Sequence, residues 1–146
     1  MIKNSLSLLF ILFYFCGFSQ KTIQKNLESI FLNSNRNISI YIPEGYEKDN
    51  LKNYPLTIVL DEEYLFDAYV GNAVLFAKKD KAPKQIVVAI SMEDTKGADI
   101  SFDINSGQLT SSAQSFYTFI RDEVLFYMES NYRTSPFITL VGQGYS

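Results

Sequence analysis

The chain has 146 residues, no histidine, one cysteine and a formal net charge of −3. A mildly acidic surface offers phosphate backbones little to hold, so the composition argues against nucleic-acid binding. The lack of histidine excludes a Ser-His-Asp triad within these residues and any histidine-based metal site. We therefore predict no metal site, with carboxylate ligands alone as a remote option.

Residues 1–20 have the layout of a secretory signal peptide. Lys3 precedes an apolar stretch over residues 6–15, which is too short to span a bilayer comfortably. Cleavage near residue 20 would leave an exported protein with no membrane segment. Cys16 raises the alternative of a lipid anchor, but the residues before it, "FYF", are bulky where lipid modification requires small ones.

The predicted mature chain is a single domain over residues 21–146. Without residues 1–20 the basic count falls from 13 to 12, so the charge becomes 12 − 16 = −4. The only cysteine is removed as well. Disulfides and thiolate metal sites are thereby excluded from the mature chain.

The first half of this domain alternates between strand and helix patterns. Residues 26–46 are typical of two strands around a polar turn, with isoleucines alternating with polar or aromatic residues over 38–42. The runs 54–61 and 85–92 are continuously apolar, which indicates strands buried on both faces. Between them, residues 63–79 have a helical spacing that Gly71 weakens, so one or two short helices are expected.

The second half begins with a polar loop over residues 93–110 and then the clearest helix, 111–132. Ser111 with Gln114 fits a capping box. An apolar stripe at three- and four-residue spacing follows, made of Ala113, Phe116, Tyr117, Ile120, Val124, Tyr127 and Met128. Residues 137–142 indicate a third buried strand. Together these elements predict an α/β fold with a mostly parallel sheet and flanking helices.

Four stretches together resemble a known family: "RNISIYIPEGYE", "YPLTIVLDEEYLFD", "FYTFIRDEVLFYMESNYRTSP" and "FITLVG". In order and spacing they are similar to the putative esterase family of α/β-hydrolases, which includes enterochelin esterases and S-formylglutathione hydrolase (esterase D). The resemblance covers nearly all of residues 21–146. It implies the N-terminal part of an α/β-hydrolase fold, incomplete at its C-terminus, acting without a cofactor on a small-molecule ester.

The resemblance also implies positions for the catalytic groups. "LVGQG" corresponds to the strand and nucleophile turn, with Gly144 in the nucleophile position. The backbone N–H groups of Glu62 and Tyr145 would hold the oxyanion, and a glycine is usual where this chain has Glu62. In the loop "KGAD", Asp99 is kept from an Arg-x-x-Asp pattern, while Lys96 and Gly97 stand near its basic position.

Glycine has no side chain to attack an acyl carbon, and Glu62 would bring negative charge toward the pocket. We therefore expect a degenerate active site without esterase activity. One alternative takes Ser146 as the nucleophile, because Gly144-Tyr145-Ser146 begins a G-x-S-x-G motif that a longer product would complete. Another is a non-catalytic binding protein that uses the old cleft.

Several other side chains have ordinary structural interpretations. Acids such as Asp61, Asp67 and Asp99 are more often solvated or cap helices than catalytic. The aromatic group formed by Tyr64, Phe66 and Tyr69 is expected to pack in the core. Glu62 and Glu63, if they continue a strand, would point to opposite faces and could not share a substrate. An incomplete sheet would also leave an edge and an apolar face for an oligomer to cover.

Overall fold

The structure is a computed structural model that describes residues 21–144. The predicted signal peptide, Tyr145 and Ser146 lie outside the described residues. Five strands form one mixed sheet in the order β1-β2-β4-β3-β5. Their bounds are β1 Lys21–Ser29, β2 Ser34–Ile42, β3 Tyr54–Leu60, β4 Ile86–Ile90 and β5 Thr134–Val141. The predicted α/β architecture is confirmed.

Parallel and antiparallel pairings divide the sheet into two parts. The hairpin of β1 and β2 is antiparallel, and β2 is also antiparallel to β4. β3 lies between β4 and β5 and is parallel to both, so these three strands end at the same edge. This shared carboxyl edge is where α/β sheets commonly place their ligands.

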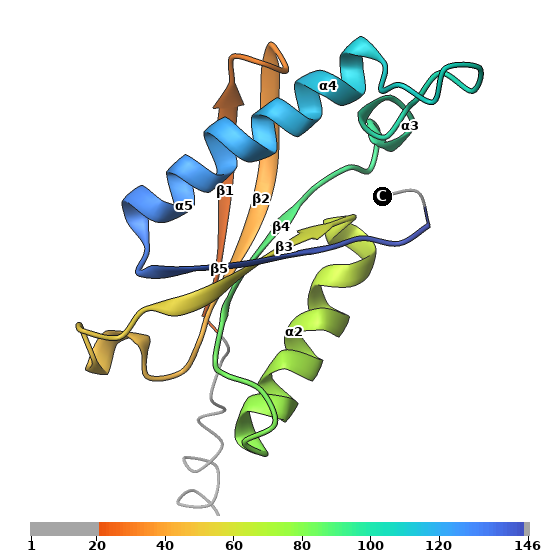
Figure 1. Ribbon diagram of the computed structural model, residues 1–146. Helices are drawn as coiled ribbons and strands as arrows, with labels where there is room; N and C mark the ends of the chain where they lie inside the picture. The colour runs from red at the N-terminus through yellow and green to blue at the C-terminus, as the bar shows by residue number, and fades with distance from the viewer. Residues whose placement is uncertain (1–20, 145–146) are drawn as a thin grey trace, which may run out of the picture.

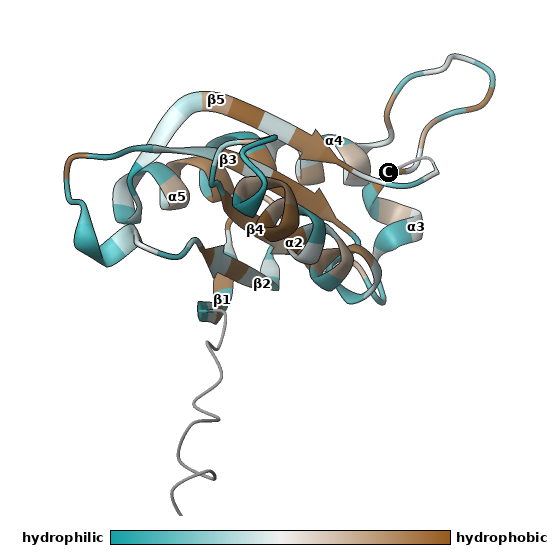
Figure 2. Ribbon diagram, turned by 90° about the horizontal axis from the view of Figure 1, so that it is seen from below, coloured by the Kyte–Doolittle hydropathy of each residue, from teal (hydrophilic) through white to brown (hydrophobic). Residues whose placement is uncertain are grey.

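Helices cover both faces of the sheet (Figure 1). α2 (Glu62–Lys78) covers one face, over a core cluster that includes Val59, Phe66 and Val87. α4 (Ser111–Thr118), the π-helical η2 (Phe119–Val124) and α5 (Leu125–Asn131) form one long helix over the other face. Figure 2 shows the apolar central strands between these two layers. Two short elements, η1 (Tyr46–Lys48) and α3 (Lys96–Asp99), lie in loops.

The alternation predicted for β2 is confirmed. Ile38, Ile40 and Ile42 belong to the larger core cluster beneath the long helix, whereas Tyr41 belongs to the cluster beneath α2. Ser39 is buried on the same face as Tyr41. Alternate residues of β2 therefore pack against the helices on opposite faces of the sheet, which explains the alternating pattern.

The long helix departs from the predicted stripe because it contains a π-helical segment. Phe119 and Val124 are both fully buried although they are five residues apart, a spacing that suits i→i+5 geometry. Tyr117, which the stripe placed in the core, is half exposed. The cap also differs by one residue, because the Thr110 side chain accepts a hydrogen bond from the Ala113 N–H.

The prediction that the last strand is buried on both faces is wrong. β5 is an edge strand whose side chains Phe137 and Leu140 are 67% and 60% exposed. It also begins three residues earlier than expected and includes Pro136, which an edge strand tolerates. The apolar run indicated burial, but among the described residues nothing pairs with its outer edge.

Candidate functional site

A cavity of about 340 Å³ lies at the carboxyl edge of the parallel strands. It lies where β3 ends before Asp61, β4 before Met92 and β5 before Gln143, which are among its lining residues. The complete lining is Asp61, Glu63, Tyr64, Met92, Glu93, Lys96 and Gln143. We call this the carboxyl-edge cavity. Three carboxylates and one ammonium dominate its chemistry.

The turn after β5 borders this cavity. Gly144 has a φ of +74°, in the left-handed region that favours glycine. A Cβ built on Gly144 would meet no atom within 4 Å, so space for a side chain exists but the backbone disfavours one. Gln143 is exposed and reaches the cavity lining. The bend thus offers no nucleophilic side chain at residues 142–144.

The loop that joins β3 to α2 is also left-handed. Asp61 has a φ of +60°, which is uncommon for a residue with a side chain. Its carbonyl oxygen accepts hydrogen bonds from the N–H groups of Tyr64 and Leu65, at 3.1 and 2.9 Å. Its carboxylate, nearly buried, pairs with the Lys96 ammonium at 2.7 Å. Asp61 therefore serves as a helix-initiating residue and as the counter-ion of Lys96.

Glu62 and Glu63 differ from the sequence expectation in both position and direction. They occupy the first turn of α2, so the argument that strand geometry separates them does not apply. Glu62 accepts a hydrogen bond from the Ser39 hydroxyl of β2 and does not line the carboxyl-edge cavity. Glu63 does line it and accepts a hydrogen bond from the Ser91 hydroxyl. The negative charge that we expected Glu62 to bring to this cavity therefore comes from Glu63.

Hydrogen bonding stabilises the ionised form of Glu63. Burial raises the pKa of this carboxyl, but the Ser91 hydroxyl and backbone N–H groups of Glu63, Met92 and Glu93 outweigh that effect. The resulting pKa lies below its ordinary value. Glu63 is also at the N-terminus of a 17-residue helix, where negative charge is favoured. The cavity therefore contains a fixed carboxylate at neutral pH.

A buried ion pair supports the loop that carries Lys96. Arg36 of β2 donates to both carboxylate oxygens of Asp99, at 2.7 and 3.3 Å, and both side chains are buried. The same guanidinium donates to the Ser91 carbonyl oxygen at 3.0 Å and lies 5.4 Å from the centre of the Phe116 ring. This network joins β2, β4, α3 and the long helix beside the cavity.

The role of Arg36 was missed at the level of sequence, although a signal for it exists. Extending the alternation of Ile38, Ile40 and Ile42 by two residues places Arg36 on the core face. A charge there requires a buried partner. Asp99, which the sequence singled out, is that partner. A Cβ built on Gly97 would meet no described atom within 4 Å, so the space beside this residue is open.

The remaining predicted site residues are dispersed. Phe66 and Tyr69 pack against the core as expected, whereas Tyr64 is 68% exposed and lines the cavity. Asp67 lies on the exposed side of α2. Tyr145 and Ser146 lie outside the described residues.

Residues 21–144 contain neither a candidate metal site nor a candidate membrane span. No cluster of histidine, cysteine and carboxylate side chains there could hold a metal ion. Over the same range, no helix has the length and apolar character needed to cross a membrane.

Comparison with known proteins identifies what this arrangement is similar to. The model of the family described as "Putative esterase" matches residues 29–145. No match was found among curated proteins. A solved IroE-like serine hydrolase from Shewanella oneidensis is 29% identical, with a TM-score of 0.76 over 86% of this chain and 43% of that one.

Two other solved structures share the fold. An uncharacterised protein from Capnocytophaga ochracea is 24% identical, with a TM-score of 0.77 over 84% of this chain and 33% of that one. The siderophore hydrolase EstB from Aspergillus nidulans is 17% identical, with a TM-score of 0.70 over 85% and 48%. The chain thus spans between a third and a half of the length of these structures.

Proposed function

Because this chain belongs to the "Putative esterase" family, we propose that it is an exported homologue of its hydrolases without esterase activity of its own. The observation that carries this proposal is Gly144, a residue without a side chain at the left-handed bend directly after β5. A sharp turn directly after a strand, at the carboxyl edge of the sheet, is where α/β-hydrolases present their nucleophilic serine. Export rests on the signal-like pattern of residues 1–20.

The charges of the carboxyl-edge cavity support the same proposal. Acyl transfer requires donors aimed at a developing oxyanion. Glu63 and Glu93 instead contribute carboxylates, and the Lys96 ammonium is paired with Asp61. These 146 residues also contain no histidine to act as the general base.

The second candidate function is ligand binding without turnover. The carboxyl-edge cavity of about 340 Å³ has a size typical of small-molecule sites and is lined by groups from all three parallel strand ends. Loss of the nucleophile would leave this space available. Because solved relatives include a protein described as a siderophore hydrolase, siderophore-like esters are sensible ligands to screen.

The third reading keeps catalysis and assigns the nucleophile to Ser146. In that case Gly144 would be the first glycine of the motif, and the general base would come from residues outside these 146. The left-handed backbone at Gly144 supports the other register, because this residue already belongs to the bend that follows β5.

A single assay series tests these readings. Purified protein is incubated with p-nitrophenyl acetate and p-nitrophenyl butyrate, and release of p-nitrophenolate is followed for the natural chain, Ser146→Ala and Gly144→Ser. We expect no turnover above background for any of them, because a serine alone lacks its base. Turnover by the natural chain that is lost in Ser146→Ala would overturn the proposal. A thermal-shift screen with acyl esters then separates binding from an inert cavity, since only binding gives a saturable shift.

A further inference from the structure

A second cavity, of about 330 Å³, lies at the opposite end of the sheet from the carboxyl edge. It is formed where β2 ends, where β1 begins and where α2 reaches its last turns. Because α2 starts at the carboxyl end of β3 and runs back along the sheet, Val74 and Lys78 lie far from Glu62 (Figure 1). We call this the amino-edge cavity. It shares no lining residue with the carboxyl-edge cavity.

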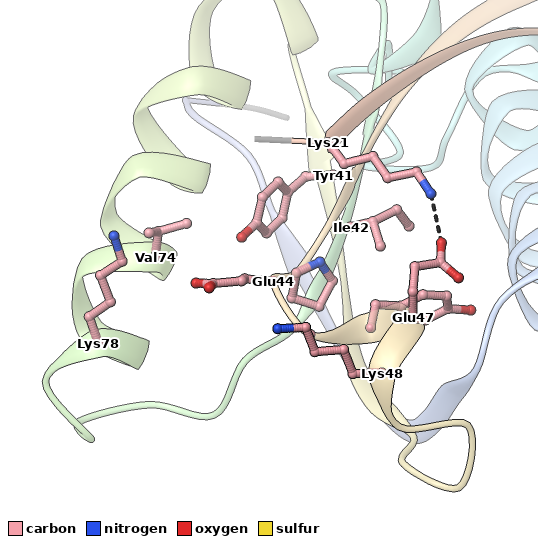
Figure 3. Close-up of a pocket in the computed structure, with 11 residues that line it drawn as sticks. Lys21, Tyr41, Ile42, Glu44, Glu47, Lys48, Val74 and Lys78 are labelled. Atoms are coloured by element: carbon pink, nitrogen blue, oxygen red, sulfur yellow. Dashed lines mark hydrogen bonds and ion pairs between the residues drawn. The ribbon is translucent and has the colours of Figure 1, made fainter. Parts of the chain in front are cut away.

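The floor of the amino-edge cavity is apolar. Tyr41 of β2 is 6% exposed and faces α2, and Pro43 next to the end of the strand is also buried. Val74 of α2 completes this surface from the other side (Figure 3). Such a floor favours a hydrocarbon or aromatic body and contributes through area removed from water.

The rim of the same cavity is charged. Lys21 pairs with Glu47 at 2.7 Å, so these two charges cancel. The side-chain ammonium groups of Lys48 and Lys78 have no hydrogen bond or ion pair with any described residue, and Glu44 is the remaining carboxylate of the lining. Figure 3 shows Lys48 and Glu44 reaching into the same space, with Lys78 on the side of α2. The uncancelled charges are two lysines and one glutamate, which leaves a balance of +1.

Glu44 has an electrostatic effect inside the cavity. Burial raises the pKa of the Tyr41 hydroxyl, and the nearby Glu44 charge raises it further. Tyr41 therefore presents a neutral hydroxyl, which can donate a hydrogen bond, at the boundary between floor and rim. A ligand with one negative charge would meet two ammonium groups and one hydroxyl donor there.

We propose that the amino-edge cavity binds a small amphipathic monocarboxylate, with its carboxylate near Lys48 and Lys78 and its apolar chain against Tyr41, Pro43 and Val74. The volume lies at the lower end of the range for small-molecule sites, which suits a small ligand. This site is separate from the carboxyl-edge cavity. It does not depend on whether the chain hydrolyses esters.

Octanoate is the probe, with octylammonium and 1-octanol as matched ligands of opposite and zero charge. Binding is followed by ¹H–¹⁵N chemical-shift titration of the natural chain. We expect saturable shifts in residues 41–48 and 74–78 with octanoate, weaker shifts with octanol and none there with octylammonium. Equal binding of octylammonium, shifts confined to the carboxyl-edge cavity, or no saturable shift up to about 10 mM would overturn the proposal.

Substitutions of single charged residues test which charges of the cavity contribute to octanoate binding. Lys48→Gln and Lys78→Gln should each weaken octanoate binding about five-fold, the size of a partly exposed ion pair. Glu44→Gln should strengthen it by a similar factor, because a competing carboxylate is removed. Lys81→Gln removes the same charge from an exposed position outside the lining and should leave affinity unchanged. If Lys81→Gln weakens binding as much as Lys78→Gln, net charge and not the cavity is responsible, and the proposal fails.

Discussion

At the scale of single residues, the Arg36–Asp99 pair is an ion pair beside the candidate site with both side chains buried. Both side chains are buried, so neither charge can turn to water if its partner is lost. We predict that Asp99→Ala lowers the free energy of unfolding by about 3–5 kcal/mol, measured by urea denaturation. Asp67→Ala, an exposed acid on α2, is the control and should change it by less than about 0.5 kcal/mol. Similar small losses for both variants would contradict a buried, uncompensated Arg36.

Glu63 gives a prediction about pH at the same scale. Its pKa in the folded chain lies below the ordinary value of 4.5, mainly because hydrogen bonds from Ser91 and nearby N–H groups outweigh the effect of burial. A depressed pKa contributes stability that is present above pH 4.5 and is lost as the pH falls through the folded value. The stability difference between the natural chain and Glu63→Gln should therefore be constant from pH 5 to 7 and should shrink below about pH 4.5. Urea denaturation across this range measures it, and a difference that grows toward acid would refute the assignment.

At the scale of elements, the π-helical segment η2 explains why the helix pattern was only partly readable from sequence. The stripe identified Ala113, Phe116, Val124 and Met128 correctly, because each lies in or next to regular α-helix. It missed Phe119, since a spacing of five residues between buried positions has no place in a 3.6-residue period. The i→i+5 hydrogen bonds of this segment determine which residues face the core, and the residue types alone indicate such bonds only weakly.

A pair of deletions tests that register. Deleting the exposed Arg121 shortens the interval from Phe119 to Val124 to four residues, so an ordinary α-helix can bury both. We expect this variant to fold, with a stability change of about 1 kcal/mol or less. Deleting Tyr117, also exposed, separates Phe116 and Phe119 by only two residues and should cost about 3 kcal/mol or more through a lost core aromatic. Circular dichroism with thermal denaturation measures both, and equal tolerance of the two deletions would contradict the explanation.

At the scale of the whole molecule, pattern reasoning found the two-layer α/β architecture because central strands and covering helices have strong periodic signals. β4 is buried throughout and β3 is buried at every residue except Pro55, as their continuous apolar runs indicated. The direction of Glu62 and Glu63 and the partner of Asp99 depend on contacts between distant segments, which no local pattern contains. β5 has the same kind of apolar run as β3, yet it lies at the sheet edge because burial depends on what pairs beside it.

The edge position of β5 leads to a prediction about self-association of the whole chain. Within residues 21–144 no strand pairs with the outer edge of β5, which also exposes Phe137, Ile138 and Leu140, and this combination favours association with another chain. We propose that purified chains self-associate through β5, seen as a sedimentation coefficient that rises with concentration. Leu140→Lys places a charge on this surface and should shift the population toward monomer. Leu51→Lys, at a loop residue that is 94% exposed, adds the same charge without touching β5 and should leave association unchanged. Equal effects of the two variants would mean that overall charge, and not the uncovered edge, governs association.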